Sequence, residues 1–137
     1  ARGRVAKANE ADVFLSIHLN AAGSEAAHGC EAFVAAGDVK PKALATALLA
    51  QIGVRGIRSR GVKWDSQSQH ASLTVLRSTY RSMKSVLLEI GFLSNACDAR
   101  LLKDKKWCEM LAEDLAPASV VTGFSPCDGS PPAPEAT

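Results

Sequence analysis

The chain has 137 residues, of which 47% are hydrophobic and 22% are charged, an ordinary composition for one globular domain. Its net charge of +2 is too small to indicate a nucleic-acid partner. The sequence contains no run of 18 apolar residues and no signal-like segment, so it predicts no membrane span.

Short apolar runs alternate with helical patterns along the chain. The predicted strands lie at residues 11–17, 29–35, 73–76 and 85–90. The predicted helices lie at residues 41–52, in a stretch capped by Ser94 or Asn95, and at residues 105–115. This alternation favours an α/β fold with a mostly parallel twisted sheet flanked by helices. Residues 1–122 are predicted to form the domain, and the Pro-rich residues 123–137 a disordered tail or linker.

Two ionisable side chains follow or interrupt the most strand-like runs. His18 comes directly after the run 11–17, and Glu89 is the only charged residue within 85–90. A carboxylate in a buried strand is costly without a purpose or a partner. Because open α/β sheets keep their chemistry at strand ends, this pair indicates a metal ligand beside a general base.

At these residues the chain resembles the zinc-dependent N-acetylmuramoyl-L-alanine amidases of the type-3 class, which are cell-wall hydrolases of bacteria and their phages. The resemblance is carried by motifs that occur in the family's order over residues 1 to about 122. These motifs are residues 4–9, 16–21, 29–33, 60–63, 73–77 and 88–95.

The resemblance implies a peptidoglycan hydrolase that cleaves the amide between N-acetylmuramic acid and L-alanine with zinc-activated water. His18 matches a zinc histidine, and Glu89 matches the catalytic glutamate that moves the proton. Asn20 and Arg77 lie in motif positions and are predicted to bind substrate, although a turn asparagine and a surface arginine are equal alternatives. The basic segment 55–63 is interpreted as a solvated loop, with contact to acidic peptide stems as the alternative. The resemblance places the protein at the bacterial cell envelope or in a phage lysin.

The family's first strands, with two further zinc ligands, have no counterpart in the sequence, so the chain is expected to be the later part of a catalytic domain. Two functions therefore stay open: a zinc amidase, and a catalytically inactive peptidoglycan-binding or regulatory module with the same fold. A sheet that lacks strands exposes an unpaired edge. The isolated chain is therefore expected to be marginally stable or to associate through that edge.

Overall fold

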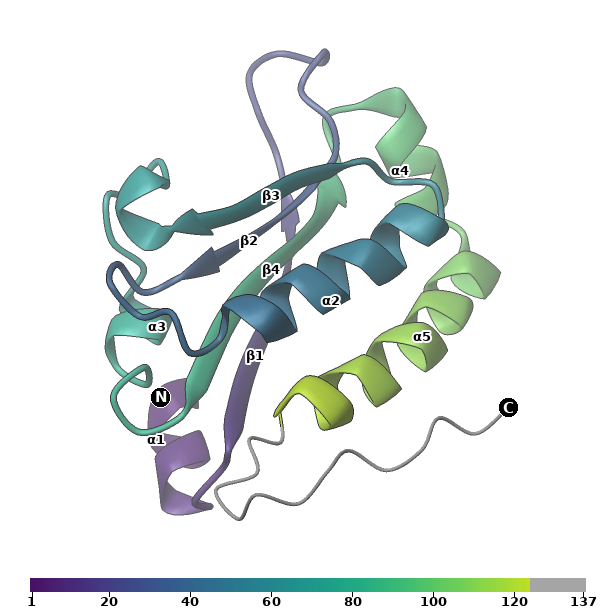
Figure 1. The fold of residues 1–137 in the computed structure, drawn as a ribbon. Coiled ribbons are helices and arrows are strands. Elements are labelled where there is room, and N and C mark those ends of the chain that lie inside the picture. The colour runs from purple at the N-terminus through teal and green to yellow at the C-terminus, as the bar shows by residue number, and fades with distance from the viewer. Residues whose placement is uncertain (124–137) are drawn as a thin grey trace.

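In the computed structural model, which describes residues 1–123, the most buried stretches form the centre of a four-stranded sheet (Figure 1). β2 (Cys30–Val34) is buried at every position, and β4 (Lys84–Phe92) over most of its length. β1 (Val13–Asn20) and β3 (Ser59–Trp64) are the edges, and the order is β1-β4-β2-β3. The pairs β1–β4 and β2–β3 are parallel, whereas β2 and β4 are antiparallel. The prediction of a mostly parallel α/β sheet is confirmed.

Two long helices cover one face of this sheet (Figure 1). α2 (Lys42–Val54) packs on β2, β3 and β4, and α5 (Lys105–Gly123) packs on α2 and joins the same core. Apolar residues at helical spacing place one stripe of each helix in the main core. That core includes Leu44, Leu48 and Ile52 of α2, Trp107, Leu111 and Leu115 of α5, and Val34, Val86 and Leu88 of the sheet.

The opposite face has a smaller cover and remains more open. A second apolar cluster there joins Phe33 and Leu87 of the sheet to Leu76 of the short helix α3 (Thr74–Arg77). Because strand side chains alternate between faces, Glu31 and Glu89 share this face with Phe33 and Leu87. The polar side chains of the central strands therefore lie on the side of the sheet away from α2 and α5.

Two further helices flank the ends of the strands. α1 (Arg2–Ala8) precedes β1, as the family resemblance implies for the first residues of the chain. α4 (Ala96–Leu102) is capped by the side chain of Asn95, which accepts hydrogen bonds from the backbone N–H groups of Cys97 and Asp98. The predicted cap is confirmed, since this carboxamide oxygen pairs two otherwise unsatisfied donors.

Three predicted elements differ from the structure. Residues 73–76 belong mostly to α3 rather than to a strand, because a short apolar run fits either a strand or a buried helical turn. The predicted loop 55–63 contains most of β3, an edge strand whose exposed, Gly-interrupted sequence resembles a loop. The last helix continues from the predicted end at residue 115 to Gly123. The predicted tail falls, from residue 124 onward, outside the described residues.

β1 forms one edge of the sheet and leaves apolar side chains uncovered. Ile17 is 56% exposed and Leu19 is 46% exposed, and both lie on the same face as α5. An edge with apolar neighbours is the expected surface for association with another strand. Within residues 1–123, none of the helices is long and apolar enough to cross a membrane.

Candidate active site

β1 and β4 place the two predicted site residues side by side. His18 and Glu89 are direct partners in the parallel register of these strands, about 5 Å apart along the hydrogen-bonding direction. Paired residues project from the same face of a sheet, so the imidazole and the carboxyl group are neighbours. The structure places both residues within their strands, whereas the sequence suggested the strand ends.

The His18 ring is held by its own strand. Ser16, two residues earlier on the same face, is buried, and its Oγ lies 2.8 Å from His18 Nε2 in a hydrogen bond. This contact uses one ring nitrogen and restrains the imidazole toward its own strand. Nδ1 is the ring nitrogen left for another partner.

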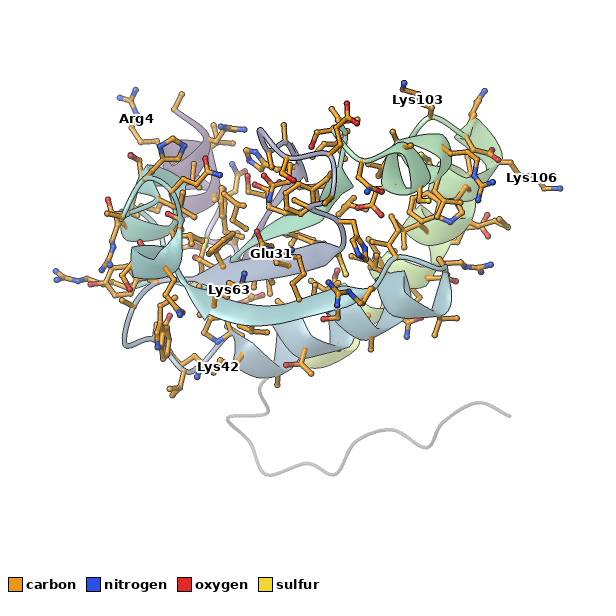
Figure 2. The ribbon with its side chains drawn as sticks, turned by 90° about the horizontal axis from the view of Figure 1, so that it is seen from above. Arg4, Glu31, Lys42, Lys63, Lys103 and Lys106 are labelled. Atoms are coloured by element: carbon orange, nitrogen blue, oxygen red, sulfur yellow. The ribbon has the colours of Figure 1, made fainter. Side chains whose placement is uncertain are left out.

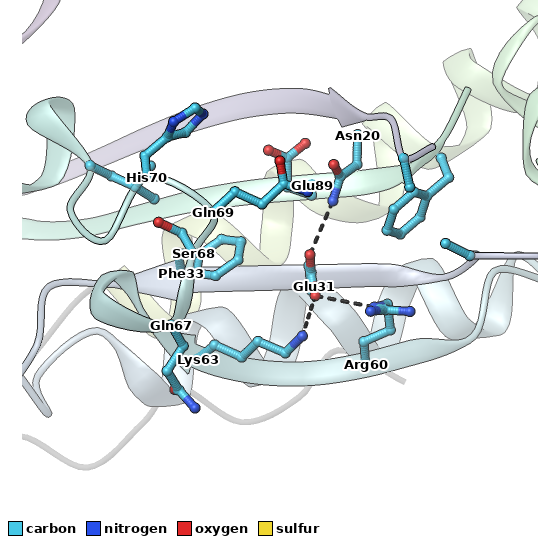
Figure 3. Close-up of a pocket in the computed structure, with 14 residues that line it drawn as sticks. Asn20, Glu31, Phe33, Arg60, Lys63, Gln67, Ser68, Gln69, His70 and Glu89 are labelled. Atoms are coloured by element: carbon cyan, nitrogen blue, oxygen red, sulfur yellow. Dashed lines mark hydrogen bonds and ion pairs between the residues drawn. The ribbon is translucent and has the colours of Figure 1, made fainter. Parts of the chain in front are cut away.

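Glu89 faces a second carboxylate across the sheet. Glu31 on β2 is its antiparallel partner and is only 5% exposed. Asn20 Nδ2 donates to Glu31 Oε1 at 3.0 Å, while Arg60 Nε and Lys63 Nζ both donate to Glu31 Oε2. Figure 3 shows this network beside Glu89, and Figure 2 shows Glu31 and Lys63 facing each other on the side of the sheet opposite α2. The charge of Glu31 is thus fully paired.

Glu89 lacks such partners. Its Oε2 atom is buried and has no hydrogen-bond partner among the described residues. Burial raises the pKa of the Glu89 carboxyl above its usual value, and the nearby charge of Glu31 raises it further. A buried acceptor without a partner, with a pKa displaced toward neutrality, is the arrangement expected of a group that exchanges protons with a ligand.

These side chains open onto a cavity of about 290 Å³ on the uncovered face of the sheet (Figure 3). Asn20, Glu31 and Glu89 line its floor, with Arg60 and Lys63 of β3 on one side. Another wall comes from the segment after β3, through Gln67, Ser68, Gln69, His70 and Leu73. Among the predicted site residues, Asn20 and Glu89 line the cavity, and His18 lies next to Glu89. Arg77 is not one of the lining residues.

Arg77 instead anchors the segment that forms this wall. Its Nε and Nη2 each donate to the carboxylate of Asp65 at 2.8 Å, and Asp65 is completely buried. Asp65 also accepts from the backbone N–H groups of Ala36 and Leu73. Burial alone would raise the pKa of Asp65, but the hydrogen bonds from Leu73, Ala36 and Arg77 hold it below its usual value. The pair fixes both ends of the segment 65–73.

We expect Arg77→Met to lower the free energy of unfolding by about 2 kcal/mol at pH 7, because Asp65 would stay buried without its cation. The loss is limited because Arg77 is partly exposed, so that solvent already screens the ion pair. Since the folded-state pKa of Asp65 is lowered, the stabilisation exists above the unfolded pKa of about 3.9 and disappears as pH falls through the folded value. Urea unfolding at pH 7 and pH 3 measures this, with exposed Arg58→Met as control. An equal loss of stability at both pH values would contradict the assignment.

The described residues do not complete a catalytic zinc site on their own. Catalytic zinc is normally held by three protein ligands and keeps one open position. No group of three His, Cys, Asp or Glu side chains that could hold a metal occurs within the described part of the chain. His18 offers one nitrogen, Glu89 is its only acidic register partner, and Glu31 is occupied by its own cations.

Sequence reasoning missed the residues that surround Glu89. Glu31 carries the same signal as Glu89, a single carboxylate within a buried apolar run, but the family motifs gave it no role. Arg60 and Lys63 fell in the segment 55–63, which was interpreted as a loop, with contact to acidic peptide stems as the alternative. Asp65 was one of several polar residues in a stretch without apolar periodicity, so its complete burial had no local signal.

The fold is that of the catalytic domains of cell-wall amidases. The catalytic domain of CwlV, an N-acetylmuramoyl-L-alanine amidase from Bacillus (Paenibacillus) polymyxa var. colistinus, superimposes with a TM-score of 0.69 at 32% identity over 84% of this chain and 59% of that one. An N-acetylmuramoyl-L-alanine amidase from Clostridium difficile 630 gives a TM-score of 0.75 at 28% identity over 87% of this chain and 61% of that one.

The model of the N-acetylmuramoyl-L-alanine amidase family Amidase_3 matches residues 1–118, and the chain belongs to this family. Its curated relatives include the amidase LytC of Bacillus subtilis (strain 168), which is 33% identical over 81% of this chain and 21% of its own length. The endolysin of Bacillus phage SPP1 is 34% identical over 84% of this chain and 41% of its own length. The chain thus covers between about a fifth and a half of the length of the curated relatives that it matches.

Proposed function

We propose that the protein hydrolyses the amide bond between N-acetylmuramic acid and L-alanine in peptidoglycan. The proposal rests on the carboxyl group of Glu89, which lies beside His18 at the floor of the cavity and whose buried Oε2 has no hydrogen-bond partner within residues 1–123. The family membership supplies the reaction class.

The chemistry requires a group that takes a proton from the attacking water and returns it to the departing amine. Glu89 suits both steps, because its raised pKa makes the protonated form a usable acid after the water has been deprotonated. Asn20 lines the cavity and keeps one carboxamide N–H beyond its bond to Glu31, which supports its assignment to substrate binding. The assignment of Arg77 to substrate binding rests on the family resemblance alone, since its described contacts are with Asp65.

Zinc is proposed as the cofactor, with His18 as one of its ligands. The resemblance to the zinc amidases and the position of His18 beside Glu89 support this proposal. The other protein ligands would have to come from outside the described residues. The small number of zinc ligands among the described residues also keeps open the alternative of an inactive peptidoglycan-binding module. Such a module would hold the cell wall in this cavity without cleaving it.

The proposed partner is therefore peptidoglycan, and the proposed place of action is the bacterial cell wall. The protein would act there either as a protein of the bacterial cell envelope or as a phage lysin. Self-association through β1 is a further proposal, supported by the exposed Ile17 and Leu19 at that edge. Sedimentation of the chain tests it, and a monomer that melts cooperatively would contradict it.

The product of digestion tests the function. We expect purified cell walls treated with the protein to release peptides with a new N-terminal L-alanine amine, with no new reducing sugar ends, as detected by mass spectrometry. Binding to cell walls without new amines would favour the inactive module. New reducing ends without new alanine amines would exclude the amidase reaction.

A further inference from the structure

A bulge in β3 turns two cationic side chains toward the same side of the sheet. Cys30 and Ala32 of β2 pair with Ser59 and Val62 of β3, so two steps along β2 match three along β3. The extra residue falls at Arg60-Gly61, where Gly61 has a φ of +91° that residues with a Cβ rarely adopt.

The bulge matters because residues three apart on a regular strand project from opposite faces. Arg60 and Lys63 are three apart, yet both donate to the same oxygen of Glu31 and both line the cavity. The added residue has restored a common face for them. Bulges next to active sites commonly re-aim side chains in this way.

Two cations share one carboxylate here, so the cluster of Arg60, Lys63 and Glu31 keeps one positive charge. Arg60 is further fixed by a bond from Nη1 to the carbonyl oxygen of His28 at 3.3 Å and by its position 5.1 Å over the Phe92 ring. Its Nη2 atom and two of the three ammonium hydrogens of Lys63 have no protein acceptor among the described residues. These donors are held in place and available at the cavity wall.

We propose that Arg60 and Lys63 form a subsite that binds a carboxylate of the peptide stem, namely the carboxylate of the acidic residue that follows L-alanine. The subsite rests on the proposed function, because that function places the scissile amide at Glu89. β2 lies between β4 and β3, so β3 is about 10 Å from β4. The long side chains of Arg60 and Lys63 extend from β3 toward Glu31 on β2 and cover part of this distance. One extended residue covers about 3.5 Å, so a carboxylate one residue beyond L-alanine reaches these donors.

Glu31 has a defined part in this subsite. It sits between the reacting carboxyl group and the cations and holds both cations in the cavity through one oxygen, while Asn20 holds its other oxygen. A bidentate or paired arrangement of charged donors gives a carboxylate both affinity and orientation. The subsite thereby discriminates stems with a free carboxylate from stems in which that group is amidated.

Peptide binding tests the proposal independently of hydrolysis. The two probes are the tripeptide L-Ala-γ-D-Glu-L-Lys with a free α-carboxylate on the glutamyl residue and the same tripeptide with an α-amide there. We expect the acid to bind the wild-type protein at least about 10-fold more tightly than the amide in calorimetric titration, since the donors are cationic. Equal dissociation constants, or no binding of the acid at millimolar concentration, would overturn the proposal.

Variants assign the preference to β3. Lys63→Met and Arg60→Gln are each expected to reduce the acid-to-amide ratio to below about threefold, whereas Lys63→Arg keeps it. Arg58→Gln is the matched control, because Arg58 is exposed and precedes the strand. Having two separate variants keeps the test decisive if one fails to fold by circular dichroism. An acid-to-amide ratio that is unchanged in both Lys63→Met and Arg60→Gln would overturn the subsite. A wild-type protein that prefers the acid but releases no alanine amines from cell walls would count only against the proposed function.

Discussion

Replacing Glu89 with glutamine is expected to lower kcat for peptidoglycan hydrolysis by about 10³-fold, within the range that general acid–base catalysis supplies. The carboxamide has nearly the same shape as the carboxyl group but cannot accept a proton from water or return one to the departing amine. Because the cavity and its other residues stay in place, binding of cell walls should change little. Dye release from labelled cell walls gives the rate, and a pull-down of the same walls gives the binding.

Protein stability separates this effect from misfolding. Glu89 is partly buried and faces Glu31, and its Oε2 has no partner in the part of the chain that the structure describes, so removing its charge relieves repulsion. Glu89→Gln should therefore unfold at a temperature equal to or above that of the wild type. Glu109→Gln, an exposed change on α5, is the control for both measurements. A kcat within tenfold of the wild type in Glu89→Gln would remove the catalytic assignment.

Replacing His18 with alanine is expected to lower both the zinc content of the protein and its activity, the latter by about 10²-fold or more. Mutation of a residue that hydrogen-bonds to a metal ligand typically lowers metal affinity or activity 10- to 100-fold. Loss of a direct ligand should lower them at least as much. Zinc per chain is measured by atomic absorption after dialysis, and activity by dye release. The readout of metal content does not depend on turnover.

His28→Ala is the matched histidine control, because the described contact of His28 is made by its backbone carbonyl oxygen. It should leave zinc content and activity unchanged. A His18→Ala protein that keeps its zinc and its activity would exclude His18 from the metal site. A wild-type protein that binds no zinc at micromolar concentration would exclude the proposed cofactor.

The sequence predicted the parts of the fold that local physics determines. Buried apolar strands have a composition that differs from their surroundings, so β2 and β4 were found near their observed bounds. The cap of α4 was narrowed to Ser94 or Asn95 because capping depends on neighbouring residues alone, and the structure shows that Asn95 is the cap. β3 was missed because an edge strand with Arg, Gly and Lys has little apolar signal, and its strand character depends on pairing with β2.

In the candidate site, too, the residues with a local sequence signal were predicted, and those whose role depends on distant contacts were not. His18 and Glu89 each stand out within an apolar motif, and the parallel pairing of β1 with β4 brings them together. The neighbours of Glu89 depend on contacts between distant segments and on a single extra residue near Gly61, which no local pattern encodes. For Arg77 the sequence left surface and substrate roles open, whereas the structure gives it a buried partner, Asp65.

A double-mutant cycle measures whether His18 and Glu89 act at one site and in one reaction. Groups that act as a unit give strongly non-additive losses, whereas groups that act independently give losses that multiply. We expect kcat/KM of the variant with both His18→Ala and Glu89→Gln to lie within about threefold of that of the more damaged single variant. A loss equal to the product of the two single losses, about 10⁵-fold, would show that the two residues act independently and not at one site.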